Sequence, residues 1–160
     1  MTTLVVQAHP LEQSYSQALL NAVVQQAPDA RVVRLGQGDR WTHYACIGVT
    51  RLVFVYPTWW GSLPAMLLDA LNEIIGPWVD GHEAAATSPF KTVESITIAT
   101  SHGSSKLVNS LQGEPGLQLW KRTILPLCAS GATLHWRSLY KIDRATDADR
   151  TTFVNSLTIG

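Results

Sequence analysis

The chain alternates short runs of apolar residues with longer stretches of helical periodicity. Wholly apolar or β-branched runs predict strands, and apolar residues that recur every three or four positions predict helices. On this basis the sequence predicts strands at residues 4–6, 31–35, 52–56, 95–100 and 132–140. It predicts helices at residues 14–27, 62–76, 117–128 and 147–157.

Capping and stop signals indicate where three of these helices begin or end. Ser14 and Gln17 form a Ser-x-x-Gln capping box at the first helix. Thr146 is a candidate N-cap for the last helix. The pair Gly76-Pro77 is expected to end the second helix.

Two connections are also informative. Residues 36–50, between the second and third strands, barely meet the length that a crossover needs, so its helix is expected to shrink to a turn or two. Residues 78–93 form a polar, Ala-rich stretch that predicts a long loop. No repeat or linker divides the chain, so residues 1–160 are expected to form a single domain.

Strands that alternate with helices indicate an α/β fold, a doubly wound parallel sheet with helices on both faces. Five strands in this length fit the flavodoxin-like order 2-1-3-4-5. Ligands of such sheets bind beyond the carboxyl ends of the strands, where the strand order reverses between strands 1 and 3. We therefore expect the functional residues in three loops, at residues 9–16, 57–63 and 101–105.

Composition and charge exclude several function classes. The sequence is 46% hydrophobic and 15% charged, which argues against a disordered chain. Twelve Lys and Arg balance twelve Asp and Glu, and this balance argues against a nucleic-acid partner. The sequence has no long apolar run, and its start lacks the basic segment of a signal peptide. A cytoplasmic protein without membrane insertion is expected.

Cysteines and histidines give little sign of a metal or a disulfide. Cys46 and Cys128 could pair, share a metal or be separate core thiols, and separate core thiols in a reducing compartment are favoured. No two histidines stand at metal-ligand spacing, so no metal site is expected.

The first loop, residues 9–16, leads from a strand into a helix N-terminus. Free N–H groups and the positive end of the helix dipole attract phosphate at such a position. The alternative is that Ser14 only caps the helix and His9 only fills a turn. The two commonest nucleotide fingerprints, GxGxxG and GxxxxGK[ST], are absent.

The second loop contains Trp59 and Trp60 between Pro57 and Gly61. Two adjacent Trp side chains in such a loop cannot both point into one core. At least one is therefore expected over an exposed site, where it offers a flat face to a planar ring. The alternative is that both pack internally or at a subunit interface.

The third loop, residues 101–105, is small and polar. It could lie along a ring edge or only turn the chain. His102 is a candidate proton donor, although an isolated loop histidine is more often solvated. No G-x-S-x-G elbow exists, so hydrolase chemistry is poorly supported.

Four stretches together resemble the NAD(P)H:quinone oxidoreductases of the flavodoxin-like fold, including the bacterial NAD(P)H dehydrogenases and the potassium-efflux ancillary oxidoreductases. These stretches are Ala8-His9-Pro10 through Ser14-Tyr15-Ser16, Tyr56-Pro57-Thr58-Trp59-Trp60 through Pro64-Ala65, Ser88-Pro89-Phe90-Lys91, and Gly103-Ser104-Ser105 through Ser110-Leu111-Gln112-Gly113.

The resemblance implies a flavin at the switch point, FMN in preference to FAD because short family members lack adenine-binding extensions. It implies that NAD(P)H gives hydride to flavin N5 and leaves before a quinone-like acceptor enters, in a homodimer. The family pattern assigns the phosphate to His9, Gln13, Ser14, Tyr15 and Ser16. It assigns the ring to Pro57, Thr58, Trp59, Trp60 and Gly61, with Ser101, His102, Gly103 and Ser104 along its edge.

The sequence departs from that family in the third loop. Quinone reductases of eukaryotes carry a Tyr and a His that stabilise charge on the reduced flavin, and Asn109 and Pro115 stand at the matching positions. His102 is the candidate replacement and the single catalytic candidate. Two other functions stay open, a flavodoxin-like electron carrier and a regulatory or sensor flavoprotein that associates with a transporter, including a variant without flavin.

Overall fold

A five-stranded sheet forms the centre of the structure, a computed structural model that describes residues 1–79 and 87–160. All neighbouring strands are parallel, and their order is β2-β1-β3-β4-β5. This order confirms the predicted doubly wound α/β sheet. The strands are β1 (Thr3–Ala8), β2 (Arg31–Leu35), β3 (Arg51–Pro57), β4 (Ser95–Ser101) and β5 (Thr133–Leu139).

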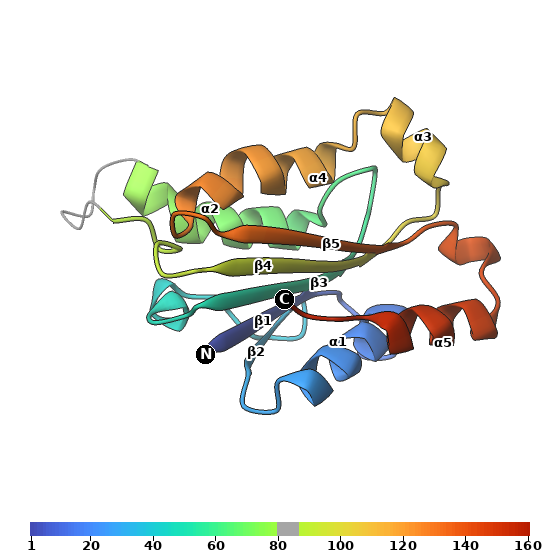
Figure 1. Cartoon of the computed structure of the whole chain (residues 1–160), viewed down its shortest axis with the longest axis horizontal. Coiled ribbons are helices and arrows are strands. Elements are labelled where there is room, and N and C mark those ends of the chain that lie inside the picture. Colours follow the sequence, from blue (N-terminus) through green and yellow to red (C-terminus); the bar gives the residue numbers. More distant parts are fainter. Residues whose placement is uncertain (80–86) are drawn as a thin grey trace.

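Helices cover both faces of the sheet (Figure 1). Helices α1 (Tyr15–Gln26) and α5 (Asp147–Ser156) lie on one face. Helices α2 (Ala65–Val79) and α4 (Pro115–Leu119) lie on the other, and α3 (Lys106–Leu111) lies near the carboxyl end of β4. The layers therefore bury the sheet on both sides, as a parallel sheet requires.

Alternation along the strands divides the core into two clusters. Leu4 and Phe54 belong to the cluster on the α2 side, which also contains Trp120. Val5 and Val53 belong to the cluster on the α1 side. Successive strand residues point to opposite faces, so the apolar runs seen in the sequence supply both clusters at once.

The helices differ from the sequence prediction in three places. Helix α3 was not predicted, and the predicted helix at 117–128 is α4 followed by a π-helical turn, Trp120–Ile124, and a 3-10 turn, Leu125–Leu127. Helix α2 continues through Pro77 to Val79. Pro77 is tolerated because it lies in the last turn, and the carbonyl it leaves unbonded belongs to the exposed residue Glu73.

Ser14 caps α1, but the predicted capping box is only half formed. The Ser14 hydroxyl accepts a hydrogen bond from the Gln17 amide at 3.2 Å. The Gln17 side chain bonds Gln7 and Asn21 instead of returning to Ser14. At α5 the predicted cap is confirmed, because Thr146 accepts from the Asp149 amide and Asp149 bonds back.

The two connections singled out in the sequence fare differently. Residues 36–50 contain one 3-10 turn, η1 (His43–Cys46), which confirms the expected loss of a full helix. The predicted loop at residues 78–93 begins inside α2 with Trp78 and Val79, and its residues 80–86 lie outside the described part.

Both cysteines are free thiols, Cys46 buried and Cys128 half-buried, so they are separate as predicted. Burial raises the pKa of Cys46 to about 11 and that of Cys128 to about 12. Among residues 1–79 and 87–160, no helix combines the length and the apolar character needed to cross a bilayer.

Candidate functional site

The carboxyl ends of β3, β4 and β5 bring their following loops to one edge of the sheet. Pro57 and Ser101 are register partners at the ends of β3 and β4. The Thr58 amide donates to the Ser101 carbonyl at 2.8 Å, and the His102 amide donates to the Leu139 carbonyl at 2.8 Å. The backbone thus fixes the start of the second and third loops relative to each other.

The second loop is a tight hairpin turn with Trp60 at its tip. Trp59 and Ser62 exchange two backbone hydrogen bonds, of 3.1 and 2.9 Å. Trp60 and Gly61, between them, have φ angles of 54° and 76°. This is the left-handed turn that usually takes Asn-Gly, and a bulky side chain rarely adopts it. The turn leaves Trp60 fully exposed, as the sequence predicted for at least one of the two Trp residues.

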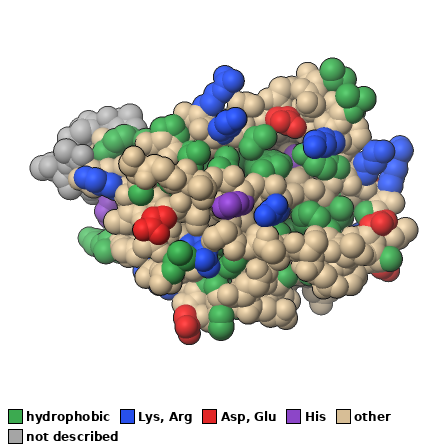
Figure 2. Space-filling model, viewed as in Figure 1, with side chains coloured by type: hydrophobic (Ala, Val, Ile, Leu, Met, Phe, Trp, Pro, Cys, Tyr) green, Lys and Arg blue, Asp and Glu red, His purple; other side chains and the backbone are tan. Residues whose placement is uncertain are grey.

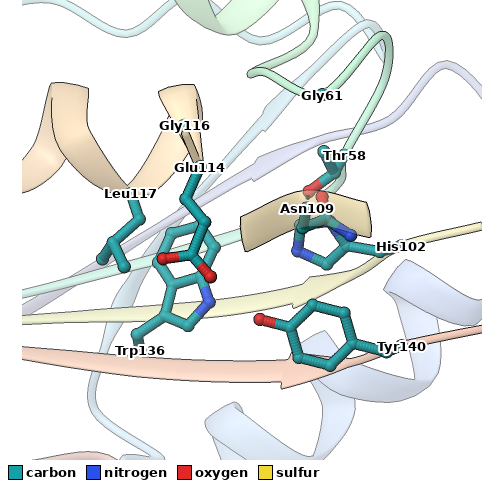
Figure 3. A pocket seen from close by; sticks show the side chains of 9 residues that line it. All are labelled: Thr58, Gly61, His102, Asn109, Glu114, Gly116, Leu117, Trp136 and Tyr140. Carbon is teal, nitrogen blue, oxygen red and sulfur yellow. Dashed lines mark hydrogen bonds between the residues drawn. The ribbon is translucent and has the colours of Figure 1, made fainter. Parts of the chain in front are cut away.

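A cavity of about 380 Å³ opens between these loops and α3. Its volume lies within the range of small-molecule and cofactor sites. Six of the predicted site residues line it, namely Thr58, Trp60, Gly61, His102, Gly103 and Ser104, together with Asn109 and Gln112. A narrower pocket continues from it and is lined in addition by Glu114, Gly116, Leu117, Trp136 and Tyr140 (Figure 3).

His102 is 5% exposed and is held on three sides. Its Nδ1 lies 3.0 Å from Asn109 Oδ1, and its Nε2 lies 3.3 Å from Thr58 Oγ1. The Tyr140 ring stacks on the imidazole, with the ring centroids 4.8 Å apart (Figure 3). The alternative of a solvated loop histidine is therefore wrong.

Burial also sets the charge of His102. It lowers the pKa of the imidazole, because the charged form would lose its hydration, and the hydrogen bond to Asn109 offsets part of this effect. The ring is therefore neutral at pH 7.

At the first loop, the structure leaves helix amides free for a ligand. The Tyr15 and Ser16 amides, in the first turn of α1, meet no acceptor within the described residues. His9 Nδ1 lies 3.0 Å from the Leu11 amide nitrogen and 3.1 Å from the Leu11 carbonyl oxygen, so the ring is held against the backbone of its own loop. The His9 ring lies 6.1 Å from the Trp59 ring, centroid to centroid, which connects the first loop to the second.

Two predicted phosphate residues have other surroundings. The Tyr15 hydroxyl donates to the Arg150 carbonyl at 3.2 Å, and burial raises the pKa of that hydroxyl to about 12. Ser16 is buried beneath the first turn. Their backbone amides, rather than their hydroxyls, are thus the groups available at this end of α1. Gln13 is exposed in the loop before it.

Sequence reasoning missed the part of the pocket that comes from α3, α4 and β5. Asn109 was noted only as a departure from a family pattern and Gln112 only as part of a family-like stretch, and Glu114, Trp136 and Tyr140 were not singled out. Tyr140 could have been found, because it directly follows β5 and the carboxyl ends of parallel strands meet at one edge. Asn109 could not, because α3 has no periodic apolar pattern long enough to predict it.

Comparisons with known proteins bear on the fold. No protein-family model matches the chain, and no curated protein does. Among solved structures, an NAD(P)H:quinone oxidoreductase from Methanothermobacter marburgensis superposes with a TM-score of 0.74 at 15% identity, over 97% of this chain and 92% of that one. The fold is flavodoxin-like.

Two further solved structures of this flavodoxin-like fold have FMN in their descriptions. An FMN-dependent NADH-azoreductase from Bacillus anthracis, in complex with FMN, has a TM-score of 0.71 at 9% identity, over 96% of this chain and 94% of that one. General stress protein 14 from Treponema denticola, also in complex with FMN, has a TM-score of 0.64 at 16% identity, over 98% and 93%. The predicted resemblance to this structural group is confirmed at the level of the fold.

Proposed function

We propose that the protein is a flavin-dependent NAD(P)H oxidoreductase acting on quinones or similar small acceptors. The observation that carries the proposal is the cavity of about 380 Å³ at the carboxyl edge of the sheet, to which the first loop is connected through the His9 and Trp59 rings, 6.1 Å apart. When bound, the flavin would supply the redox chemistry, accepting hydride at N5 from NAD(P)H and passing it to the acceptor. The fold shared with quinone reductases and azoreductases supports this class.

The phosphate end of FMN fits the chain's first loop. The Tyr15 and Ser16 amides have no protein acceptor within the described residues, and only Nδ1 of the His9 ring in the same loop is bonded to the protein. Amides in the first turn of a helix bind phosphate well because the helix dipole adds to their hydrogen bonds. We assign the phosphate to these groups, with Gln13 and Ser14 beside them.

The ring end fits the second and third loops. At Gly103 an added Cβ would lie 2.7 Å from Asp143 Oδ2, so a side chain there would require the Asp143 carboxylate to move, whereas glycine leaves it in place. The bare backbone can then approach a planar ring closely. Thr58, Trp60 and Gly61 of the second loop also line the cavity. Pro57, Trp59 and Ser101 are sequence neighbours of lining residues.

His102 is our candidate catalytic group, because it is the one imidazole that lines the cavity among the described residues. Reduction of a quinone by hydride also consumes a proton. A proton taken up on the His102 ring is readily given away, because burial lowers the pKa of the imidazole. Ser104 and Gly103 would position the ligand edge beside it.

We propose FMN rather than FAD as the cofactor and a homodimer as the working form. Two solved structures of this fold, the Bacillus anthracis azoreductase and the Treponema denticola general stress protein 14, are complexes with FMN. For the homodimer, the support is that Leu107 and Leu111 of α3 are 70% and 80% exposed near the cavity and that Trp60 is fully exposed.

Acidic and basic side chains are scattered over the face in Figure 2, without a basic patch that would suit a nucleic acid.

An absorbance spectrum of the purified protein tests the proposal. We expect FMN to bind and its visible absorbance to bleach when NADH or NADPH is added without oxygen. Bound flavin that neither nucleotide reduces would contradict an oxidoreductase and favour an electron carrier or a transporter-associated sensor. Failure to bind FMN or FAD would contradict the flavin site itself.

A further inference from the structure

Four side chains beside the cavity form a continuous line of hydrogen bonds. Asn109 Oδ1 lies 3.0 Å from His102 Nδ1, and His102 Nε2 lies 3.3 Å from Thr58 Oγ1. Thr58 Oγ1 lies 3.0 Å from Thr100 Oγ1. Asn109, His102 and Thr58 line the cavity, so the line runs along the cavity wall and ends at the buried Thr100.

The direction of each bond follows from one fixed group. Asn109 Nδ2 lies 2.9 Å from the Ser105 carbonyl oxygen, which can only accept. The amide nitrogen must therefore face Ser105, and the amide oxygen must face His102. Because that oxygen can only accept, His102 Nδ1 must carry the proton of the neutral ring.

The same logic continues to the cavity. With its proton on Nδ1, His102 has a lone pair on Nε2, so the Thr58 hydroxyl donates to it. Thr58 has no second proton, so Thr100 donates to Thr58. The Thr58 hydroxyl therefore has no proton left for a ligand, and it offers the ligand one lone pair on Oγ1.

We infer that Asn109 is the positioning residue of this site: its amide fixes the protonated nitrogen of His102, and His102 makes Thr58 Oγ1 a hydrogen-bond acceptor toward the cavity. A ligand N–H is thereby favoured over a ligand lone pair at this position. If the proposed function holds, this acceptor would favour a flavin that presents an N–H to Thr58, as the reduced ring can at N5, over one that presents a lone pair.

Other ionisable groups around His102 do not reverse this assignment. Tyr140 stacks on the imidazole face, and Glu114 lines the same narrow pocket. The Asp143 carboxylate lies against Gly103, the next residue along the chain. None of the three has a hydrogen bond to either ring nitrogen of His102.

The first test uses the protein without flavin, so it does not depend on the proposed function. Nitrogen-15 NMR at neutral pH distinguishes the two neutral tautomers of histidine, and we expect His102 in the Nδ1–H form. Asn109→Leu should convert a large fraction of His102 to the other tautomer. Asn109→Asp should keep the Nδ1–H form and raise the pKa of His102 by about one unit, because a carboxylate favours the charged ring.

The two variants control for folding. Both lose the Asn109 Nδ2 bonds to Ser104 and Ser105, so a tautomer change that occurs only in the leucine variant reports the missing acceptor rather than the loss of those two bonds. If the leucine variant keeps the wild-type tautomer, or if wild-type His102 carries its proton on Nε2, the inference is wrong.

The second test concerns Thr58. Thr58→Val should shift the His102 Nε2 resonance toward that of a free lone pair without changing the tautomer. An unchanged resonance would mean that Thr58 does not donate to His102, and would overturn this part of the inference. In the FMN-loaded protein the same variant should lower the reduction potential. Failure of FMN to bind would count against the proposed function and leave the tautomer result intact.

Discussion

His102 and His43 show how surroundings set the behaviour of one residue type. His102 is buried against Tyr140, whereas His43 is exposed in η1. Unfolding would release His102 to water, where the pKa of an imidazole returns to about 6.5. Below that pH the unfolded chain binds a proton that the folded chain excludes, because burial lowers the pKa of His102. The stability that depends on neutral His102 is thus fully present above pH 6.5 and is lost as the pH falls below that value.

We predict that the free energy of unfolding falls between pH 7 and pH 5, with a contribution from His102 of up to about 1.4 kcal/mol per pH unit. Urea unfolding of the flavin-free protein at several pH values measures this slope. His102→Gln should flatten it, and His43→Gln, at an exposed histidine, is the matched control for replacement of an imidazole. Identical slopes for wild type and His102→Gln would show that His102 does not titrate as described.

Trp60 has a backbone conformation that lowers the stability of the folded protein. Its φ of 54° is strained for any residue with a bulky side chain, and its exposed ring recovers nothing by packing. We predict that Trp60→Asn raises the free energy of unfolding by about 1 kcal/mol, because Asn tolerates this conformation. FMN affinity should fall by about tenfold through loss of the ring contact. Titration of both proteins with FMN would reveal unchanged affinity if Trp60 plays no part in binding.

At the scale of the element, the N-terminus of α1 combines a structural cap with a candidate phosphate site. The Ser14 hydroxyl caps the helix, while the Tyr15 and Ser16 amides have no acceptor among the described residues. Carboxylate and amide side chains cap helices as well as hydroxyls do. A charge can therefore be introduced at position 14 without removing the cap.

We predict that Ser14→Asp weakens FMN binding by at least about tenfold through repulsion between the carboxylate and the phosphate. Ser14→Asn, which caps without charge, should bind FMN within a few-fold of wild type. Thermal unfolding should be similar for both variants. Equal FMN affinity of the two variants would remove the first loop from the proposed site.

The sequence could predict those elements whose pattern is strong by itself. The five strands and helices α1, α2 and α5 have apolar runs or caps, and all were predicted. Helix α3 is six residues long with its apolar side chains exposed, so no periodic signal marks it. Since Asn109 and Gln112 belong to α3 and its end, their place in the cavity could not be predicted either. The proximity of the loops after β3 and β4 could be predicted, because the strand order alone brings these loops together.

At the scale of the whole molecule, one group of exposed apolar side chains lies near the cavity, and Tyr44 and Ile47 are exposed separately, in and just after η1. Leu107 and Leu111 lie on α3, and Trp60 lies on the hairpin turn. Exposed apolar side chains rimmed by polar ones often mark contact surfaces between proteins. This distribution supports the homodimer that we propose.

We predict that Leu111→Glu converts the dimer to a monomer, because a charge buried at an interface is strongly unfavourable. Ile47→Glu, at an exposed residue of the connection between β2 and β3, should leave the dimer intact. Sedimentation velocity gives the mass of each form. A wild-type protein that sediments as a monomer at high concentration would contradict the proposed dimer.

The strand order has a consequence for how the molecule is completed during synthesis. Once β2 has paired with one edge of β1, β3 adds to the other edge of β1, β4 adds to β3 and β5 adds to β4. The pocket walls follow the same sequence, ending with Trp136 and Tyr140 from β5 and the residue after it. A chain emerging from the ribosome therefore has no complete narrow pocket until its final strand has docked, although the residues that line the larger cavity have already been made.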